Sequence, residues 1–529
     1  MACPLPGRQT VQGRGNWRLG ATPVMLSKLS IFPTLPIEAM KRALASYANQ
    51  VKPLIRMETV LANEIASGKS PLTQPESDTV LYALALAKLH TLHADGRDVL
   101  VDQALGYFRE RIVDAFRPIM LDNHGAIDYY EMGRLIPALH DEIVRMEERL
   151  LQTHVNDFSR AHLEDELTRK ELVLVLGGGG GSGYVYLGAF AALEEAGILP
   201  SYMVGSSMGA IMGALRGTMG NFDIDVALNI LKGLRWRDVF RFMTMENRYG
   251  LPATLRLHLQ ATMQHHFLMD DLPMRLDQLT IPTEVVVAGI KLGGLPHEPS
   301  YYEGLLDLGG VRGPLQVAAF RKRIGRMYDS IRELLMNPSV LHELVMGRDP
   351  LTHTFDVIDA VGFSSAIPGV IHYDVIREDP RMHSILQAVM AKHGLARLVD
   401  GGVVANVPAR TAWLGVQEGK IKRRNTFILA LDSFAPGFNA NMLFAPIQHL
   451  VQQNVKRDRP YAHQVKAFHD VLSPLNLVPR YDRVVHAVVK GKRSLERDMA
   501  FVRTMMTPIQ APSAYRAQGL TFGDPVVFT

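Results

Sequence analysis

The 529 residues are enough for roughly two to four domains of ordinary size. Hydrophobic residues make up 47% and charged residues 21% of the chain, which is typical of a folded globular protein and argues against disorder. The single cysteine, Cys3, excludes an intrachain disulfide, a cysteine zinc cluster and a CxxC redox site.

Residues 1–35 are the first segment with a distinct composition. They are rich in Pro, Gly and Arg without periodicity, which predicts an irregular arm. They contain no basic segment followed by an apolar run, so we expect no secretory signal peptide. No part of the chain approaches 18 uninterrupted apolar residues, the length that a transmembrane helix needs. We therefore expect a cytoplasmic protein that is at most peripheral to a membrane.

Residues 36–169 are predicted to form a helical domain of four to six helices, because Gly and Pro are sparse and apolar residues follow a helical period. Two sets recur at close to three- and four-residue spacing: Leu81, Leu84, Leu86, Leu89 and Leu92, and Ile136, Leu139, Ile143, Met146 and Leu150. This domain carries no chemistry that the sequence identifies.

A change of pattern at residue 170 predicts an α/β domain that extends to residue 433. Residues 172–176 form a continuous apolar run that ends in glycines, typical of a strand buried on both faces of a parallel sheet. A helical pattern follows from Leu187 to Ala196, then a short strand at 202–204 and a small-residue helix from Ala210. This alternation predicts a βαβ unit.

Three further strands are expected at residues 284–288, 396–399 and 426–431. A segment at about 291–352, rich in Gly and Pro before it becomes helical, reads as an insertion into the sheet domain. Residues 434–529 are mixed and basic. From residue 403 onward 17 Lys and Arg stand against 8 Asp and Glu, a net of +9 that leaves −5 for the remainder. This charge suits an anionic partner such as a phospholipid surface, although a solvated basic face also accounts for it.

The pentapeptide Gly205-Ser206-Ser207-Met208-Gly209 matches the G-x-S-x-G pattern of a nucleophile elbow. In such an elbow Gly205 and Gly209 are required because the sharp turn from strand to helix brings neighbouring backbone too close for side chains. The pattern alone is weak. Here an apolar strand precedes it and a small-residue helix follows it, as the motif demands.

Five glycines, Gly177 to Gly181, follow the first strand, and Ser182 and Gly183 continue into a helix. Such a loop leaves backbone N–H groups free to bind an anion. No Lys-Ser/Thr follows, which argues against a P-loop, and no acidic residue ends the second strand, which argues against a dinucleotide site. Because a right-handed crossover places the two strands side by side, the loop is expected beside Ser207, where an oxyanion hole is needed.

Asp400 ends a predicted strand and is followed by Gly401 and Gly402. The arrangement places a carboxylate at the sheet edge with open backbone around it. Asp-Gly-Gly is also common in turns, so this tripeptide alone favours no function.

Together these blocks resemble the patatin-like phospholipase family. The match comprises the glycine loop with the helix Leu187–Ile198, the elbow, the segment Gly362–Gly369 with Ser365 and Pro368, and Asp400-Gly401-Gly402, in the family's order over residues 170–433. The resemblance implies a three-layer α/β/α fold with a mostly parallel central sheet, preceded by an all-helical region. A bacterial patatin-like protein with an N-terminal helical extension would fit this arrangement.

The resemblance also implies a serine lipid acyl hydrolase with a Ser207–Asp400 dyad and no histidine. Ser207 would attack a lipid ester, Asp400 would take its proton, and the amides of Gly178, Gly179 and Gly180, with Gly183 beside them, would hold the oxyanion. A lipid or phospholipid is the expected substrate and transient membrane contact through basic segments is expected. We expect no cofactor, metal or nucleic-acid partner, and the sequence does not specify the oligomeric state.

One departure from the family pattern and two alternatives remain. Family members commonly have Arg or Lys where this chain has Ser182, which removes a positive charge near the loop. A Ser-Asp-His esterase is possible in principle, since four histidines follow Asp400 in the chain order of the α/β-hydrolases: His449, His463, His469 and His486. A catalytically weak lipid-binding or scaffold protein on the same fold is the other alternative.

Overall fold

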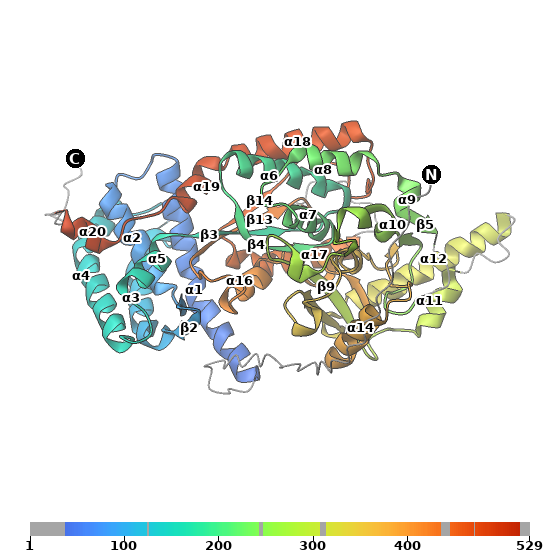
Figure 1. Ribbon diagram of the computed structural model, residues 1–529, viewed down its shortest axis with the longest axis horizontal. Helices are drawn as coiled ribbons and strands as arrows, with labels where there is room; N and C mark the ends of the chain where they lie inside the picture. Colours follow the sequence, from blue (N-terminus) through green and yellow to red (C-terminus); the bar gives the residue numbers. More distant parts are fainter. Residues whose placement is uncertain are drawn as a thin grey trace, which may run out of the picture. The chain divides into compact units, whose positions relative to one another are not determined.

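The computed structural model describes residues 37–123, 126–242, 247–306, 314–434, 445–469 and 471–518 (Figure 1). The arm predicted at residues 1–35 lies outside this part of the chain. The chain divides into two compact units, residues 1–48 and 49–529, and the packing described below is that of the second unit. Within the described residues, no helix combines the length and apolar character needed to cross a membrane.

The region predicted to be helical contains five helices: α1 (Ile37–Ala66), α2 (Gln74–Ala87), α3 (Asp102–Met120), α4 (Tyr129–Thr153) and α5 (Arg160–Thr168). The central one is α2, in which every residue from Ser77 to Ala87 is buried. Apolar side chains of the other helices pack around it and form a core separate from that of the sheet domain. A helix that is buried on all sides has no polar face, which explains why Leu and Ala occur around the whole circumference of α2.

One hairpin interrupts the helices. Leu92, which the periodicity placed in a helix, lies instead in strand β1 (Thr91–Ala94), which pairs antiparallel with β2 (Arg97–Leu100). Asp95 and Gly96 connect the strands with φ of 48° and 77°. Asp-Gly is the favoured pair for such a two-residue turn, because both positions need positive φ.

The last described helix, α20 (Pro512–Ala517), packs on the helical region. The Tyr515 hydroxyl donates to the Asp78 carboxylate of α2 at 2.6 Å, and the Gln510 amide donates to the same carboxylate at 2.9 Å across 432 residues of sequence. Ile509 and Ala511 belong to the core of the helical region. Residues 509–517 and the helical region thus share one core.

The sheet domain is built on seven strands: β3 (Glu171–Leu176), β4 (Pro200–Ser206), β9 (Thr283–Lys291), β10 (Leu341–Met346), β12 (Leu395–Asp400), β13 (Thr426–Asp432) and β14 (Gln464–Ala467). Their order is β10-β9-β4-β3-β13-β14, with β12 pairing β9. The five strands β9, β4, β3, β13 and β14 run parallel, whereas β10 and β12 run antiparallel to β9. The mostly parallel sheet agrees with the prediction, and every residue of β13 is buried, as expected for a central strand.

The antiparallel strand β12 brings the two halves of the site together. β4 runs along the first half of β9 and ends where Ser206 pairs Val286. β12 runs in the opposite direction along the second half and ends where Asp400 pairs Val287. Because Val286 and Val287 are adjacent, the ends of β4 and β12 meet beside one another.

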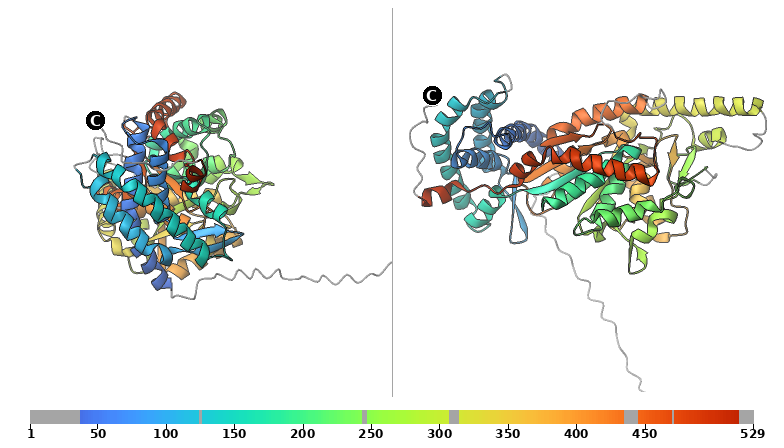
Figure 2. Two further views of the ribbon diagram at one scale, coloured as in Figure 1. Left: turned by 90° about the vertical axis from the view of Figure 1, so that its left-hand side faces the viewer. Right: turned by 90° about the horizontal axis from the view of Figure 1, so that it is seen from above.

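Helices cover both faces of the sheet. α6 (Val185–Glu195) and α18 (Tyr481–Glu496) lie along each other on one face, and α16 (Ala409–Gln417) packs on the other (Figure 1; Figure 2, right). The α6–α18 crossing is close: a Cβ on Gly188 would lie 2.0 Å from the Val488 carbonyl oxygen, and one on Gly491 would lie 2.0 Å from that of Val185. With β14 and α18, the chain beyond residue 433 thus contributes an edge strand and a covering helix to this domain.

The remaining elements surround the sheet. Helices are α7 (Met208–Gly217), α8 (Ile224–Lys232), α9 (Trp236–Val239), α10 (Leu259–Met263), α11 (Pro299–Leu306), α12 (Pro314–Leu335), α13 (Val357–Ser364), α14 (Pro380–His393), α15 (Gly402–Ala405), α17 (Ala445–Asp458) and α19 (Met499–Met506). Strands are β5 (Phe240–Phe242), β6 (Leu255–Leu257), β7 (Leu268–Met269), β8 (Leu272–Pro273) and β11 (Ile371–His372). Short 3-10 turns are η1 (Gly180–Tyr184), η2 (Gln264–His266), η3 (Leu276–Gln278), η4 (Pro338–Val340), η5 (Pro350–Thr352) and η7 (Arg459–Tyr461). The segment predicted as an insertion, 291–352, contains α11, α12 and also β10, which is an edge strand of the central sheet that the sequence did not predict.

Candidate active site

Ser207 lies in the sharp turn between β4 and α7. Its φ of 53° and ψ of −125° are strained for a residue with a side chain, as is typical of a nucleophile elbow. A Cβ on Gly205 would lie 2.6 Å from the Ala210 Cα, and one on Gly209 would lie 2.1 Å from the Leu176 carbonyl oxygen. Both glycines are therefore required by close backbone approach, as the sequence argument held.

Ser364 holds this elbow in place. Its hydroxyl accepts a hydrogen bond from the Ser207 amide at 2.8 Å and donates one to the Val286 carbonyl at 2.6 Å. Ser364 is completely buried. The sequence argument selected its neighbour Ser365 and missed this role, since a run of two serines at a helix end does not indicate which hydroxyl binds backbone.

Asp400 lies at the end of β12, buried beside the elbow. Burial raises the pKa of Asp400 to about 7, while the Ser207 hydroxyl and the Gly402 amide act in the opposite direction. The Gly402 amide donates to Oδ1 at 2.7 Å. Among the described residues, Oδ2 has no hydrogen-bond partner, so one carboxylate oxygen remains available to accept a proton.

The loop around Ser365 and Pro368 buttresses Asp400. The Asp400 amide donates to the Ala366 carbonyl at 2.9 Å, and the Gly401 amide donates to that of Ser364 at 3.1 Å. Ser365 faces the pocket described below, and its hydroxyl has no partner among the described groups. Pro368 is buried and does not line the pocket.

The glycine loop lies directly beside Ser207. A Cβ on Gly178 would lie 3.0 Å from the Ser207 Cβ, and one on Gly183 would lie 2.5 Å from the Met208 Cγ. The Gly178 amide donates to the Asn406 carbonyl at 3.0 Å, so it is not free to bind an oxyanion. The amides of Gly179 and Gly180 make no backbone hydrogen bond in the described chain, and Gly180 lines the pocket together with Ser207.

Ser182 supports the loop from behind. Its hydroxyl is fully buried, donates to the Gly179 carbonyl at 2.6 Å and lies 3.2 Å from the Ser433 hydroxyl. The Tyr186 hydroxyl, in turn, lies 2.9 Å from Ser433 Oγ and 2.8 Å from the Gly177 carbonyl oxygen. Because a trans peptide directs its C=O and N–H to opposite sides, the bond to the Gly179 carbonyl fixes the direction of the Gly180 N–H.

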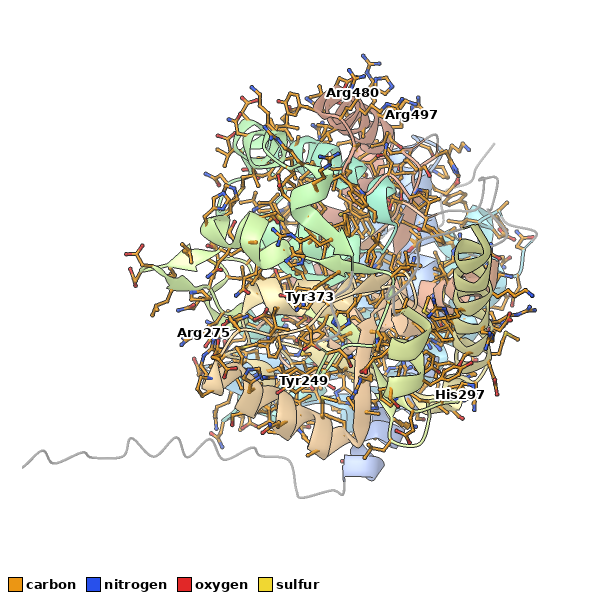
Figure 3. All side chains as sticks on the ribbon, turned by 90° about the vertical axis from the view of Figure 1, so that its right-hand side faces the viewer. Tyr249, Arg275, His297, Tyr373, Arg480 and Arg497 are labelled. Carbon is orange, nitrogen blue, oxygen red and sulfur yellow. The ribbon has the colours of Figure 1, made fainter. Side chains whose placement is uncertain are left out.

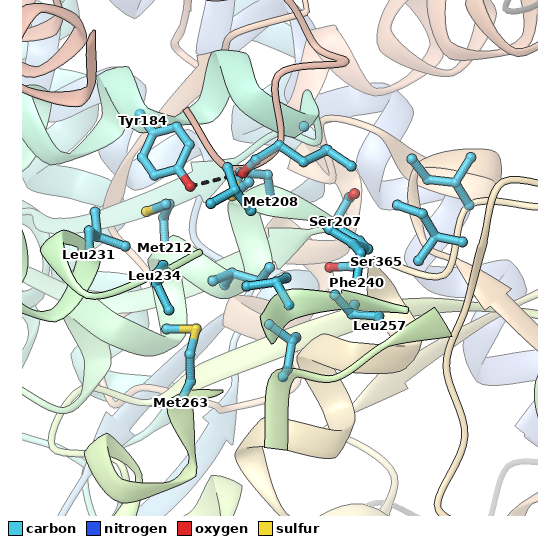
Figure 4. Close-up of a pocket in the computed structure, with 18 residues that line it drawn as sticks. Tyr184, Ser207, Met208, Met212, Leu231, Leu234, Phe240, Leu257, Met263 and Ser365 are labelled. Carbon is cyan, nitrogen blue, oxygen red and sulfur yellow. Dashed lines mark hydrogen bonds between the residues drawn. The ribbon is translucent and has the colours of Figure 1, made fainter. Parts of the chain in front are cut away.

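An apolar pocket opens at Ser207 (Figure 4) and encloses about 620 Å³ together with its mouth. Its lining comprises Gly180, Tyr184, Ser207, Met208, Ile211, Met212, Leu231, Leu234, Val239, Phe240, Leu257, Leu259, Met263, Ser365, Ile367, Ile371, Leu477 and Val478. None of these residues is charged, and the Tyr184 hydroxyl is bonded to the Leu477 carbonyl at 3.0 Å. The pocket can hold a hydrocarbon chain with one end at Ser207.

The histidines of the described chain do not join this site. No histidine lines the pocket or contributes to the pKa shift of Asp400. His463 Nε2 lies 2.9 Å from the Glu58 carboxylate, and its Nδ1 accepts from the Ile428 amide. His486 is exposed on α18, and the side chain of His449 lies outside the described residues.

Comparison with known proteins finds local similarity to patatin-like and lipase sequences. Residues 174–413 match the family model described as Patatin-like phospholipase, and all four motif blocks fall within the match. Relatives include the triacylglycerol lipase ptl3 of Schizosaccharomyces pombe, 30% identical over 148 residues, and patatin-like phospholipase domain-containing protein 6 of Homo sapiens, 42% identical over 84 residues. The neuropathy target esterase sws of Drosophila melanogaster is 48% identical over 60 residues.

These matches are local. They cover 26%, 16% and 11% of this chain, and 29%, 6% and 4% of the three relatives, respectively. The helical region and the chain beyond residue 413 lie outside the family match. The match and the motifs together identify residues 174–413 as a patatin domain. Its strands belong to the mostly parallel central sheet between layers of helices, to which β13 and β14 are added from beyond residue 413.

Proposed function

We propose that this protein is a serine lipid acyl hydrolase that cleaves carboxylic esters of lipids, as a phospholipase A or lysophospholipase does, through a Ser207–Asp400 dyad. The observation that carries the proposal is the strained, buried Ser207 at the mouth of an uncharged pocket, beside an aspartate whose pKa is raised to about 7. The names of the relatives, a lipase, a phospholipase-domain protein and an esterase, support the same chemistry.

The raised pKa addresses the main difficulty of a dyad without histidine. An aspartate at its ordinary pKa is a weak base for a serine hydroxyl, whereas a base whose pKa lies near the working pH is both unprotonated and basic enough to accept a proton. Burial without a cationic neighbour raises the pKa of Asp400 into that range. The supporting hydrogen bond from Gly402 orients the carboxylate and leaves Oδ2 available.

In the proposed reaction, Ser207 Oγ attacks the ester carbonyl carbon while its proton passes to Asp400. The oxyanion is held by the free amides of Gly179 and Gly180 and by that of Met208, whose N–H at the start of α7 has no intrahelical acceptor. Collapse of the tetrahedral intermediate expels the alcohol, which takes the proton from Asp400. A water molecule then gives a proton to Asp400 as it attacks the acyl carbon. Collapse of this second tetrahedral intermediate releases the fatty acid, and Asp400 returns the proton to Ser207 Oγ.

This assignment differs from the sequence expectation in two donors: the Gly178 amide is already bonded to Asn406, and the Met208 amide takes its place. Gly178 would instead serve by packing against Ser207 without a side chain. Transient contact with a membrane through basic segments is part of the proposal, because the substrate class resides there.

The test is hydrolysis of a series of p-nitrophenyl acyl esters and of phospholipid vesicles by wild type, Ser207→Ala and Asp400→Asn. We expect activity in the wild type to be lost in both variants and to rise with acyl length until the pocket is filled. Replacement of His463, His469 or His486 by Gln should leave the dyad chemistry intact, and loss of activity in His469→Gln or His486→Gln would favour a Ser-Asp-His esterase. A wild type no better than Ser207→Ala would favour a lipid-binding protein on this fold.

A further inference from the structure

Two segments that are distant in sequence contribute half-buried residues to the lining of the pocket. Six of the lining residues are only half-buried: Gly180, Ile211, Leu234, Ile367, Leu477 and Val478. Three of these six, Leu234, Leu477 and Val478, belong to the two segments. Leu234 connects α8 to α9, whereas Leu477 and Val478 precede α18. We call residues 231–241 and 475–483, which flank these positions, the rim.

Two side-chain contacts tie the rim together and to the pocket. The Lys232 ammonium lies 5.7 Å from the centre of the Tyr481 ring, which joins the end of α8 to the start of α18. The Trp236 ring packs on Phe240, with ring centres 5.6 Å apart, and Phe240 lines the pocket. A membrane or protein that binds the rim therefore binds beside the half-buried part of the pocket lining.

The rim exposes large apolar side chains. Trp236 is 45% exposed, Leu475 50% and Tyr481 38%. Single exposed apolar residues are ordinary on protein surfaces, but here three lie within the two short segments of the rim. Trp and Tyr are also the residues enriched where a protein meets the interfacial layer of a membrane, since each combines an apolar ring with a polar group.

The rim is basic as well. It contains six basic residues against two acidic ones, a net charge of +4: Lys232, Arg235, Arg237, Arg241, Arg480 and Arg483 against Asp238 and Asp482. Arg480 and Asp482 form an exposed ion pair at 3.2 Å, and Arg480 projects outward at the start of α18 (Figure 3). Within the part of the chain that the structure describes, Lys232, Arg235 and Arg237 have no acidic partner.

We propose that the rim is a docking surface for a lipid bilayer with anionic headgroups, seating the pocket entrance on the membrane. This inference rests on the proposed function, since it supplies the route by which an acyl chain enters the pocket. Basic residues attract anionic headgroups, while Trp236, Leu475 and Tyr481 enter the interfacial layer. The acyl chain then passes from lipid to the uncharged pocket without crossing bulk water.

The experiment measures binding of the full chain to vesicles in the Ser207→Ala background, so that hydrolysis does not alter the lipid. Vesicles are either phosphatidylcholine alone or phosphatidylcholine with phosphatidylglycerol. The double variant Arg235→Glu/Arg237→Glu alters the rim, and Trp236→Ala removes its largest apolar group. The control, Arg145→Glu/Arg149→Glu, makes the same charge change at exposed positions of α4.

We expect the rim pair to weaken binding to anionic vesicles by about tenfold or more, and the control pair by less than about twofold. Trp236→Ala should weaken the binding that persists at high salt, where charge attraction is screened. Absence of wild-type binding to anionic vesicles, or an equal loss in both double variants, overturns the proposal. Ester hydrolysis that survives Ser207→Ala would refute the proposed function instead, and that assay is independent of vesicle binding.

Discussion

Replacing Asp400 by Asn should make the protein more stable, and increasingly so as the pH rises. The carboxyl group has an ordinary pKa of 3.8, which burial raises to about 7 in the folded chain. Between these values the unfolded chain releases the proton and the folded chain retains it, so the wild type loses stability as the pH rises through this window. Asparagine does not ionise and its oxygen can still accept the bond from the Gly402 amide.

The size of the effect follows from the shift. About 3 pKa units correspond to about 4 kcal/mol of destabilisation above pH 7, at about 1.4 kcal/mol per unit. At pH 5 the wild type has lost only about 1.6 kcal/mol of this stability, because the pH is little more than one unit above the pKa of the unfolded chain. The stability advantage of Asp400→Asn should therefore grow by about 2.5 kcal/mol between pH 5 and pH 8.5, with the rise complete just above pH 7.

Scanning calorimetry of both proteins at several pH values measures this growth, which should widen the gap in Tm by about 2–3 °C. Asp349→Asn is a control for which the stability should change with pH in the opposite direction. Burial pushes the pKa of Asp349 upward, but hydrogen bonds from Lys392 and His393 outweigh it and lower the pKa, so this variant should lose stability near neutral pH relative to acid. An Asp400→Asn gap in Tm that is equal at pH 5 and 8.5 would refute a buried, proton-retaining Asp400.

Four further predictions concern activity and packing. Because Asp400 must be unprotonated to act as base, kcat/KM for a soluble ester should fall about tenfold per pH unit below pH 7 and level off above it, and a flat profile from pH 5 to 8 would contradict this role. Ser182→Ala should lower kcat about tenfold and leave KM and the pH midpoint unchanged, because the Gly180 amide loses its orientation. A change in KM with kcat unchanged would argue against this role of Ser182. Ser364→Ala removes the hydroxyl that bonds the Ser207 amide and the Val286 carbonyl. It should lower the free energy of unfolding by about 2 kcal/mol relative to wild type, measured by denaturant titration of both proteins. Gly491→Ala should cost about 1–3 kcal/mol by pushing α18 from α6, whereas Gly106→Ala on α3, where a Cβ meets nothing within 4 Å, should be neutral or stabilising in the same titration.

Much of the site could be predicted because its motifs depend on local backbone geometry. The elbow needs small residues at Gly205 and Gly209, and the structure has backbone atoms in the space that their side chains would occupy. The neighbouring strands β3 and β4 follow from the handedness of a βαβ unit, and their register pairs Leu176 with Gly205. The glycine loop and Ser207 are therefore neighbours, as expected from sequence alone.

The approach of Asp400 to Ser207 could not be derived in this way. An apolar strand pattern indicates burial and does not specify the direction of pairing, and β12 proves antiparallel to β9. Hydrogen-bond partners are likewise absent from a sequence pattern, which is why the engagement of the Gly178 amide by Asn406 was not foreseen. The edge strand β14 was missed because its four residues are only half-buried and mix polar with apolar side chains.

The hairpin at residues 91–100 was within reach of sequence reasoning. Asp95-Gly96 lies between short segments of suitable residues and is among the strongest local indications of a two-residue turn. The leucine spacing before it outweighed that indication, because Leu86, Leu89 and Leu92 continue a helical period past the end of α2 at Ala87.

The bond between Tyr515 and Asp78 has a consequence for the order in which the protein can be completed. During synthesis, α2 leaves the ribosome long before residues 509–517 have been made. Until then the Asp78 carboxylate lacks the hydrogen bonds from Gln510 and Tyr515, and the core beside it lacks Ile509 and Ala511. Domains that fold from the N-terminus during synthesis do not face this delay. The helical region of this chain should therefore reach its final stability only after the sheet domain has been made. A chaperone that covers the apolar surface of α2 during that interval would protect it from aggregation.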